Sequence, residues 1–181
     1  MYKTLSALIL CLISLIESGC SGKQDTTENV ATENQESALA YSVPTPSGYD
    51  GPAGVPSFIM TDINNSQINT ADLRGDLTII FFNPDCDHCQ REAQSISGSK
   101  NLFKGKQLYF ISVDELDAIR KFRIDYGLTD NNFHFAKSDV ELIVRAMGPI
   151  SSVPSMFFYK NGKNTGQLEG EKTAAELAAK M

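Results

Sequence analysis

The stretch Leu77–Glu92, LTIIFFNPDCDHCQRE, decides the fold of this 181-residue chain. Its first six residues, Leu77–Phe82, are almost all apolar, and the Asn83-Pro84 pair ends the run, which predicts a short buried strand. Cys86 and Cys89 then stand at the start of a predicted helix. The free N–H groups and the dipole of a helix start stabilise a thiolate on the first cysteine. The stretch therefore predicts a site for thiol–disulfide exchange.

Within this stretch the two cysteines predict different roles. Cys86 is nearer the helix start and is expected to be the exposed nucleophile, whereas Cys89 is one turn further and is expected to be the buried resolving thiol. A purely structural disulfide and half of a metal site are the alternatives. A zinc site needs four ligands, and the chain beyond the N-terminal segment contains no second cysteine pair.

Composition and charge limit the classes of function. The chain is 41% hydrophobic and 21% charged, which suits one globular domain with additional segments. Its formal net charge of -6 argues against nucleic acid as a partner, because binding to phosphates requires basic patches. The chain contains no run of about 18 apolar residues, so the sequence predicts no conventional membrane-spanning helix.

The N-terminal residues 1–19 have the pattern of a signal peptide, with an apolar run from Leu5 to Ile16. Small residues before Cys20 resemble a bacterial lipoprotein signal, which implies that Cys20 becomes the lipidated first residue. Glu17 departs from that pattern, and an ordinary secretory peptide or an uncleaved anchor is the alternative. All three place the domain outside the cytoplasm, where disulfides persist. Cys11 is then discarded with the peptide.

Residues 20–50 are polar and lack apolar periodicity, which predicts a flexible linker. Residues 51–181 are the predicted domain. Strands are expected at 58–60, 67–68, 77–82, 107–113, 133–136, 155–159 and 165–168, and helices at 87–99, 114–126, 139–147 and 173–181. Thr70 is expected to cap a short helical turn that Gly75 closes, and Thr173 to cap the last helix. In the helix at 114–126, the inward residues are expected to be Leu116, Ile119, Phe122 and Ile124.

This order of elements, together with FFNPDCDHC and Val153-Pro154-Ser155, resembles the thioredoxin superfamily. The turn Asp72–Gly75 and Glu92, three residues after Cys89, make residues 54–181 more similar to its TlpA/ResA-like branch. The resemblance implies an α/β three-layer fold, in which helices flank a central mixed sheet and an N-terminal β-hairpin is added. Departures are the absence of Trp, the apolar Ile80 where thioredoxins carry a buried aspartate, and a missing proline after Glu92.

The same resemblance assigns further residues to the site. Pro154 is implied to be a cis-proline beside the cysteines, with its preceding carbonyl pairing to substrate backbone; an ordinary trans turn proline is the alternative. Glu92 is implied to help deprotonate Cys89, or else only stabilises the helix dipole. An imidazolium at His88 is expected to stabilise the Cys86 thiolate, an effect that Asp87 opposes; the alternative is a solvated helix-start residue without tuning effect.

The sequence thus predicts an enzyme of the cell envelope, on the periplasmic side and lipid-anchored through Cys20. It exchanges disulfides with client proteins, as a reductant supplied by a membrane thiol donor, and needs no cofactor beyond the redox-active Cys86–Cys89 disulfide. One alternative is a copper-binding metallochaperone that uses His134 as a distal ligand, although such proteins usually space their cysteines by three residues. Another is a binding module in which the two cysteines are only a structural staple.

Overall fold

The computed structural model describes residues 54–181. The predicted signal peptide, the linker, Cys11 and the lipidation of Cys20 lie outside the described residues. Among residues 54–181, no helix is both long enough and apolar enough to cross a membrane.

The described chain alternates strands and helices in the predicted order. The strands are β1 (Ile59–Asp62), β2 (Gln67–Asn69), β3 (Leu77–Phe81), β4 (Gln107–Ser112), β5 (Phe133–Lys137), β6 (Ser155–Lys160) and β7 (Lys163–Glu169). The α-helices are α1 (Asp87–Gly98), α2 (Leu116–Asp125), α3 (Val140–Met147) and α4 (Ala174–Lys180), and short 3-10 helices occupy Thr70–Asp72 and Lys100–Phe103.

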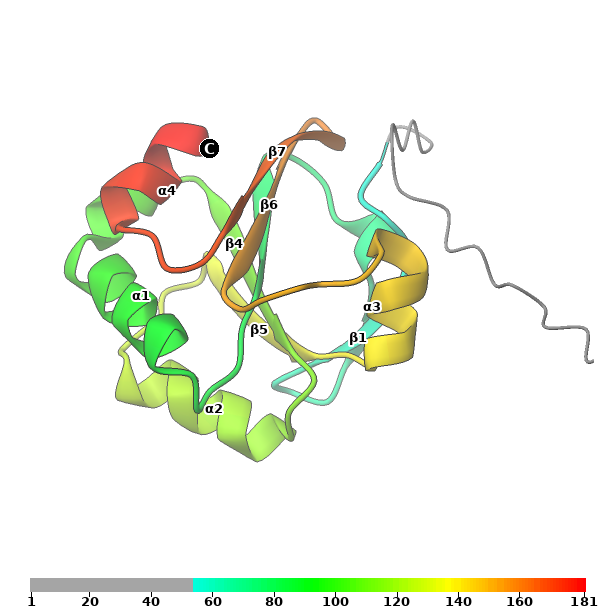
Figure 1. The fold of residues 1–181 in the computed structure, drawn as a ribbon, viewed down its shortest axis with the longest axis horizontal. Coiled ribbons are helices and arrows are strands. Elements are labelled where there is room, and N and C mark those ends of the chain that lie inside the picture. The colour runs from blue at the N-terminus through cyan, green and yellow to red at the C-terminus, as the bar shows by residue number, and fades with distance from the viewer. Residues whose placement is uncertain (1–53) are drawn as a thin grey trace, which may run out of the picture. The chain divides into compact units, whose positions relative to one another are not determined.

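The strands form one mixed sheet in the order β2-β1-β5-β4-β3-β6-β7. Strands β3, β4 and β5 are parallel, whereas β6, β7 and the β1–β2 hairpin join antiparallel. Figure 1 shows α1, α2 and α4 on one side of this sheet and α3 on the other. The predicted three-layer fold with an N-terminal hairpin is therefore confirmed.

Strand β3 lies in the interior of the sheet, between β4 and β6, and all five of its residues are buried. Ile80 belongs to the apolar cluster under α1, α2 and α4, whereas its neighbours Ile79 and Phe81 belong to the cluster under α3. Side chains of a strand alternate between the two faces, so an uninterrupted apolar run is what a strand covered on both faces requires. The end of this interior strand leads directly into the turn that carries Cys86 and Cys89 to the start of α1.

Two local predictions are wrong. Asn69, not Thr70, caps the 3-10 helix, since its side chain accepts a hydrogen bond from the Ala71 N–H. Thr70 is fully buried, and its hydroxyl oxygen accepts a hydrogen bond from the Phe58 N–H instead. Ile124 is 66% exposed rather than inward. A turn of 3.6 residues places Tyr126, and not Ile124, over the stripe that Ile119 and Phe122 begin.

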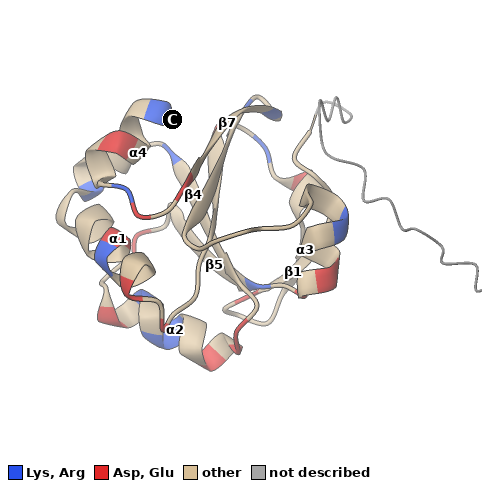
Figure 2. Ribbon diagram, viewed as in Figure 1, with Lys and Arg blue, Asp and Glu red and all other residues tan. Residues whose placement is uncertain are grey.

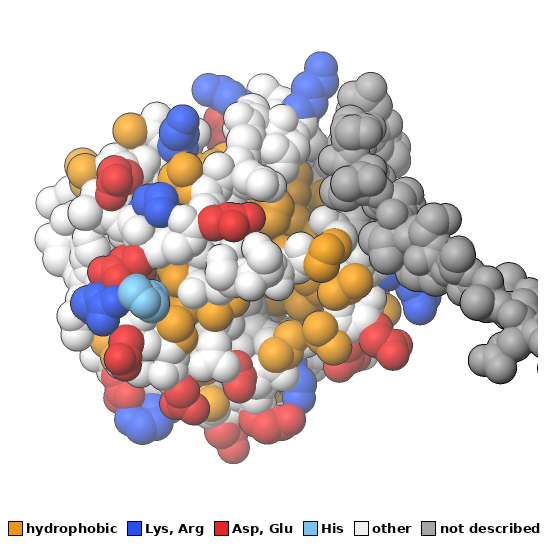
Figure 3. All heavy atoms as spheres, viewed as in Figure 1, with side chains coloured by type: hydrophobic (Ala, Val, Ile, Leu, Met, Phe, Trp, Pro, Cys, Tyr) orange, Lys and Arg blue, Asp and Glu red, His pale blue; other side chains and the backbone are white. Residues whose placement is uncertain are grey.

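The turns near the C-terminus agree with the sequence. Asn161 and Gly162 both have positive φ, at 49° and 77°, as a two-residue hairpin turn between β6 and β7 requires. Thr173 caps α4 in a capping box with Glu176. Acidic and basic residues occur together along α1, α2 and α3 (Figure 2). In Figure 3, apolar side chains reach the surface around α3, where Val140 and Val144 are exposed.

Candidate active site

The turn between β3 and α1 is fixed by Asn83. Its carbonyl accepts a hydrogen bond from the Cys86 N–H at 3.1 Å, and its side-chain oxygen accepts one from the Asp85 N–H at 2.8 Å. Its side-chain amide donates to the Asp114 carboxylate at 3.2 Å, and the Ser112 hydroxyl donates to the same oxygen at 2.6 Å. Because Ser112 is the last residue of the neighbouring strand β4 and Asp114 follows it, the turn is tied to the sheet on which the site is built.

Cys86 is the N-cap residue of α1 and is half-buried. A residue at this position lies against the unpaired N–H groups of the first helical turn, which stabilise negative charge. The Cys86 Sγ atom donates toward the Val153 carbonyl oxygen, 3.8 Å away. The Val153–Pro154 peptide bond is cis, as the resemblance implied, so the loop before β6 forms one wall beside this cysteine.

Cys89 lies one turn further along α1 and is 3% exposed. Burial raises the pKa of its thiol to about 12, although the Asn83 backbone acts in the opposite direction. The structure holds both cysteines as free thiols. The buried thiol therefore stays protonated near neutral pH unless a base accepts its proton.

Glu92 is the candidate for such a base, because its carboxyl is also buried and lies on the same helix, three residues after Cys89. It is 2% exposed and is the only acidic or basic side chain buried within residues 54–181. Burial raises the pKa of its carboxyl to about 7, and the Lys172 backbone N–H, which donates to the Glu92 Oε2 atom at 3.0 Å, limits that rise. A carboxyl that titrates near neutral pH can both accept and return a proton there.

The outer side of the same helix carries a group of charged residues. Glu171, from the loop between β7 and α4, accepts hydrogen bonds from Arg91 at 2.7 Å and contacts the His88 Nδ1 atom at 2.9 Å. These partners lower the pKa of the Glu171 carboxyl to about 2. The His88 side chain is 62% exposed, and Asp87 is exposed as well. The expected tuning of Cys86 by Asp87 and His88 stays a prediction.

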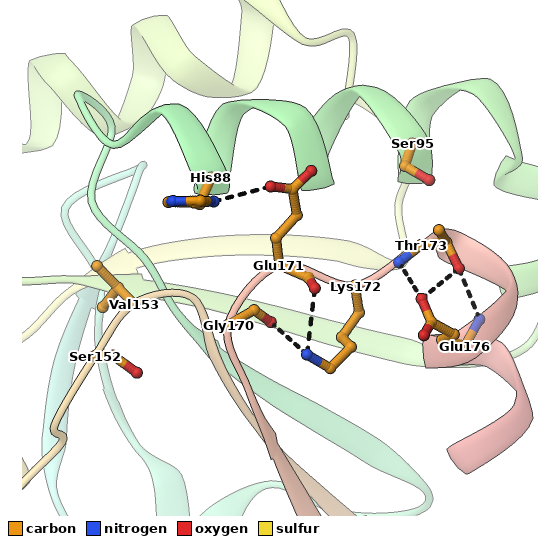
Figure 4. A pocket seen from close by; sticks show the side chains of 9 residues that line it. All are labelled: His88, Ser95, Ser152, Val153, Gly170, Glu171, Lys172, Thr173 and Glu176. Atoms are coloured by element: carbon orange, nitrogen blue, oxygen red, sulfur yellow. Dashed lines mark hydrogen bonds and ion pairs between the residues drawn. The ribbon is translucent and has the colours of Figure 1, made fainter.

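A pocket of about 580 Å³ lies between α1, the loop before β6 and the start of α4. Figure 4 shows Val153 and Ser152 on one side of it, and the Gly170–Thr173 segment on the other, below His88 on α1. Val153, which lines the pocket, also has its carbonyl oxygen 3.8 Å from the Cys86 Sγ atom, so the pocket lies close to this cysteine.

Sequence reasoning named Cys86, Cys89, Glu92, His88 and Pro154, and the structure gathers them around the start of α1. It missed a second set of residues, on other elements, that contact this group: Asn83, Asp114, Glu171 and Lys172. Only Asn83 carried a local signal, as a turn residue before proline. The others are polar residues in loops, and nothing in their local pattern separates them from solvated ones.

His134 does not join the site. Its ring stacks on Tyr109 with centroids 4.4 Å apart, and its Nε2 atom contacts Gln107 at 2.7 Å. Its neighbours Phe133 and Phe135 belong to the cluster that contains Cys89, so His134 points to the other face of the sheet. In the part of the chain that the structure describes, no three His, Cys, Asp or Glu side chains are grouped as metal ligands.

Comparisons with known proteins agree with this geometry. The model of the AhpC/TSA family matches residues 53–158. The thiol–disulfide oxidoreductase ResA of Bacillus thuringiensis (strain Al Hakam) is 29% identical over 127 residues, which cover 67% of this chain and 71% of that protein.

Solved structures share the fold. A secreted disulfide oxidoreductase of Mycobacterium tuberculosis, homologous to E. coli DsbE, has a TM-score of 0.56 at 22% identity and covers 68% of this chain and 92% of its own. A thiol:disulfide interchange protein of Chlorobium tepidum TLS has a TM-score of 0.58 at 20% identity and covers 74% and 96%. At such identities these structures establish the thioredoxin-like fold alone, and the match to the AhpC/TSA model establishes the family. The chain belongs to the AhpC/TSA family, as a ResA/TlpA-like thiol–disulfide oxidoreductase of the thioredoxin superfamily.

Proposed function

We propose that this protein exchanges disulfides with client proteins outside the cytoplasm, and that it acts as a reductant through Cys86 and Cys89. The observation that carries the proposal is the pairing of a half-buried thiol at the N-cap of α1 with a buried thiol one turn behind it. The half-buried thiol of Cys86 can react with a client protein, whereas the buried thiol of Cys89 can react only with Cys86.

The first step is attack on a client disulfide. The Cys86 thiolate forms a bond to one client sulfur, the client S–S bond breaks, and the other client sulfur leaves as a thiolate that takes up a proton. The pocket beside Val153 holds the client segment. The Val153 carbonyl, which faces the Cys86 Sγ atom at 3.8 Å in the free protein, accepts a hydrogen bond from the client backbone.

The second step is resolution of the mixed disulfide. Cys89 gives its proton to the Glu92 carboxylate, attacks Cys86 Sγ and releases the second client thiolate, to which that proton is returned. The client gains two electrons and becomes a dithiol, while the protein becomes the Cys86–Cys89 disulfide. The base is needed because burial raises the pKa of Cys89 to about 12, and a Glu92 carboxyl with a pKa of about 7 is half ionised near neutral pH.

Continued reduction requires an electron donor, which we propose is a membrane thiol protein that returns the disulfide to the dithiol. The lipoprotein-like pattern at Cys20 supports a lipid anchor, with residues 20–50 as a tether on the periplasmic side. A secreted relative of the same fold is in keeping with this location. Mass spectrometry of the mature N-terminus tests the anchor, because an unmodified terminus at another residue rejects it.

Substitution of the resolving cysteine tests the exchange itself. In Cys89→Ser the first step remains but the second is blocked, so we expect mixed disulfides between Cys86 and client proteins to accumulate. They are detected as adducts on non-reducing gels that a reductant removes. The matched control is Cys86→Ser, which is expected to form none. Equal adduct formation by the two variants, or none by either, contradicts the proposed function.

The direction of electron flow is tested by equilibrating the Cys86–Cys89 couple with glutathione. We expect a potential near or below about -220 mV, which suits a reductant, whereas a value near about -120 mV marks an oxidant. The copper chaperone that the sequence left open finds no supporting observation, because His134 lies on the opposite face of the sheet from the cluster that contains Cys89.

A further inference from the structure

The three residues Gly170, Glu171 and Lys172, here called the 170–172 loop, connect β7 to α4 and contact three separate parts of the site. The Gly170 N–H donates to the Pro154 carbonyl at 2.8 Å. The Glu171 side chain contacts Arg91 and His88 on the outer side of α1. The Lys172 N–H donates to the Glu92 carboxylate on the inner side of α1. One tripeptide thus links the cis-proline, the helix surface and the buried acid.

Contacts within this loop contribute to its backbone conformation. Gly170 has φ of 72°, a left-handed value that glycine adopts without a steric penalty. The Lys172 ammonium group turns back and donates to the carbonyl oxygens of Glu169, Gly170 and Glu171, at 2.6, 3.2 and 3.2 Å. Figure 4 shows this ammonium group beside Gly170, and the Glu171 carboxylate directed at the His88 ring.

The contact of Glu171 with α1 is a network and not one isolated pair. Arg91 donates to Glu171 from both Nε and Nη2, with distances between 2.7 and 3.1 Å, and Arg91 Nη2 also lies 2.7 Å from His88 Nδ1. A two-pronged arginine contact fixes direction as well as distance. Because Glu171 and Lys172 are neighbours in the chain, holding the Glu171 side chain on α1 restrains the position of the Lys172 N–H.

We propose that Glu171 and Arg91 are positioning residues, whose contact holds the Lys172 N–H on the Glu92 carboxylate and so sets the pH range in which Cys89 is activated. The effect on Cys89 rests on the proposed function, but the role of Glu171 and Arg91 in holding the Lys172 N–H on Glu92 is independent of exchange activity. Neither residue touches a reacting sulfur. Their effect reaches the chemistry through Glu92, by the hydrogen bond from the Lys172 N–H and by the negative charge of Glu171.

Removal of Glu171 has two opposite expected effects on the pKa of Glu92, one from the lost charge and one from the displaced Lys172 N–H. A titration of Glu92 therefore distinguishes them. The charged or titratable groups that act on Glu92 are Lys172 and Glu171 in this loop and Cys89 on its own helix. As a nearby negative charge, Glu171 raises the pKa of Glu92, so loss of charge alone lowers it. Loss of the hydrogen bond from a displaced Lys172 N–H raises it, because that bond stabilises the ionised carboxylate.

The experiment is a carbon-13 NMR titration of the Glu92 carboxyl in the full reduced chain, comparing wild type with Glu171→Ala. We expect the midpoint to rise by about 0.5–1 pH unit, as loss of one hydrogen bond to a buried carboxylate implies. Glu171→Gln removes the charge but keeps an oxygen that Arg91 can bond, so its midpoint is expected to lie below that of Glu171→Ala. Lys121→Gln, which removes an ion pair on α2, is the control and is expected to leave it unchanged.

A midpoint that falls or stays unchanged in Glu171→Ala overturns the proposal. Amide hydrogen exchange at Lys172 is the second readout and is expected to be faster in Glu171→Ala than in Lys121→Gln; equal exchange also overturns it. In single-turnover reactions, resolution by Cys89 at pH 7 is expected to slow about two- to fivefold and to recover at higher pH. If the titration shifts but no exchange occurs at all, the proposed function fails and the positioning role stands.

Discussion

The first two turns of α1 present two faces that differ completely, although their residues alternate in the chain. Cys89 and Glu92 lie on the inner face, where burial raises the pKa of each group. His88 and Arg91, one residue earlier in each case, lie on the outer face and share an exposed ion-pair network with Glu171. On the inner face, burial brings the pKa of the Glu92 carboxyl to about 7, where the group can accept and return a proton near neutral pH.

On the inner face, the burial that brings the pKa of Glu92 near neutral pH also lowers the stability of the folded protein. A carboxyl removed from water prefers its neutral form, so keeping Glu92 buried is unfavourable whenever it is ionised. The single N–H from Lys172 offsets part of this cost. The outer face carries no such cost, because solvent and salt screen its charges. Substitutions on the inner face are therefore expected to change activity and stability much more than substitutions on the outer face.

The largest effect is expected from Glu92→Gln on the resolving step. An amide keeps the size of the side chain but cannot accept the Cys89 proton, so decay of the mixed disulfide at pH 7 should slow on the order of 100-fold. Rapid acid quenching and separation of the adduct measure that decay. Attack by Cys86 should change little in the same variant. Equal decay rates in the variant and the wild type would remove Glu92 from the mechanism.

The same substitution is expected to change how stability depends on pH. The folded-state pKa of Glu92, about 7, lies above the ordinary value of 4.5, so the folded state binds the extra proton. The stability that this proton supplies is fully present below about pH 4.5 and is lost as the pH rises through about 7, and it amounts to about 3 kcal/mol. Urea unfolding at several pH values across this range should reveal the loss in wild type and not in Glu92→Gln. Parallel curves for the two proteins would contradict it.

The smallest effect is expected on the outer face, from His88→Asn. The ring is largely exposed and is engaged by Glu171 and Arg91, so its influence on the Cys86 thiolate is screened. We expect the potential of the Cys86–Cys89 couple to change by less than about 30 mV, measured against glutathione. Lys121→Gln, which removes an exposed ion pair on α2, is the control. A shift of 60 mV or more, on the order of a hundredfold in the equilibrium, would mean that the outer face tunes the thiolate directly.

Several parts of the site were readable from sequence because their signals are local. The apolar run of β3, the Asn83-Pro84 break and the cysteines that follow them lie within one stretch of chain. Thr173 was found from its capping position, whereas the cis-proline at Pro154 was implied only by the resemblance to the thioredoxin superfamily. Local patterns failed at Thr70 and Ile124, where neighbours from other elements, or the phase of the helix, decided burial.

The sequence by itself determined the order of elements, the buried strand β3 and the pair of cysteines at a helix start. These depend on side-chain type and on short spacings, which set backbone conformation directly. Only the tertiary structure decided that Lys172, 80 residues away, donates to Glu92, and that Glu171 contacts His88 and Arg91. Sheet topology creates those contacts by carrying the end of β7 beside α1, and no local pattern of charge or hydropathy contains that information.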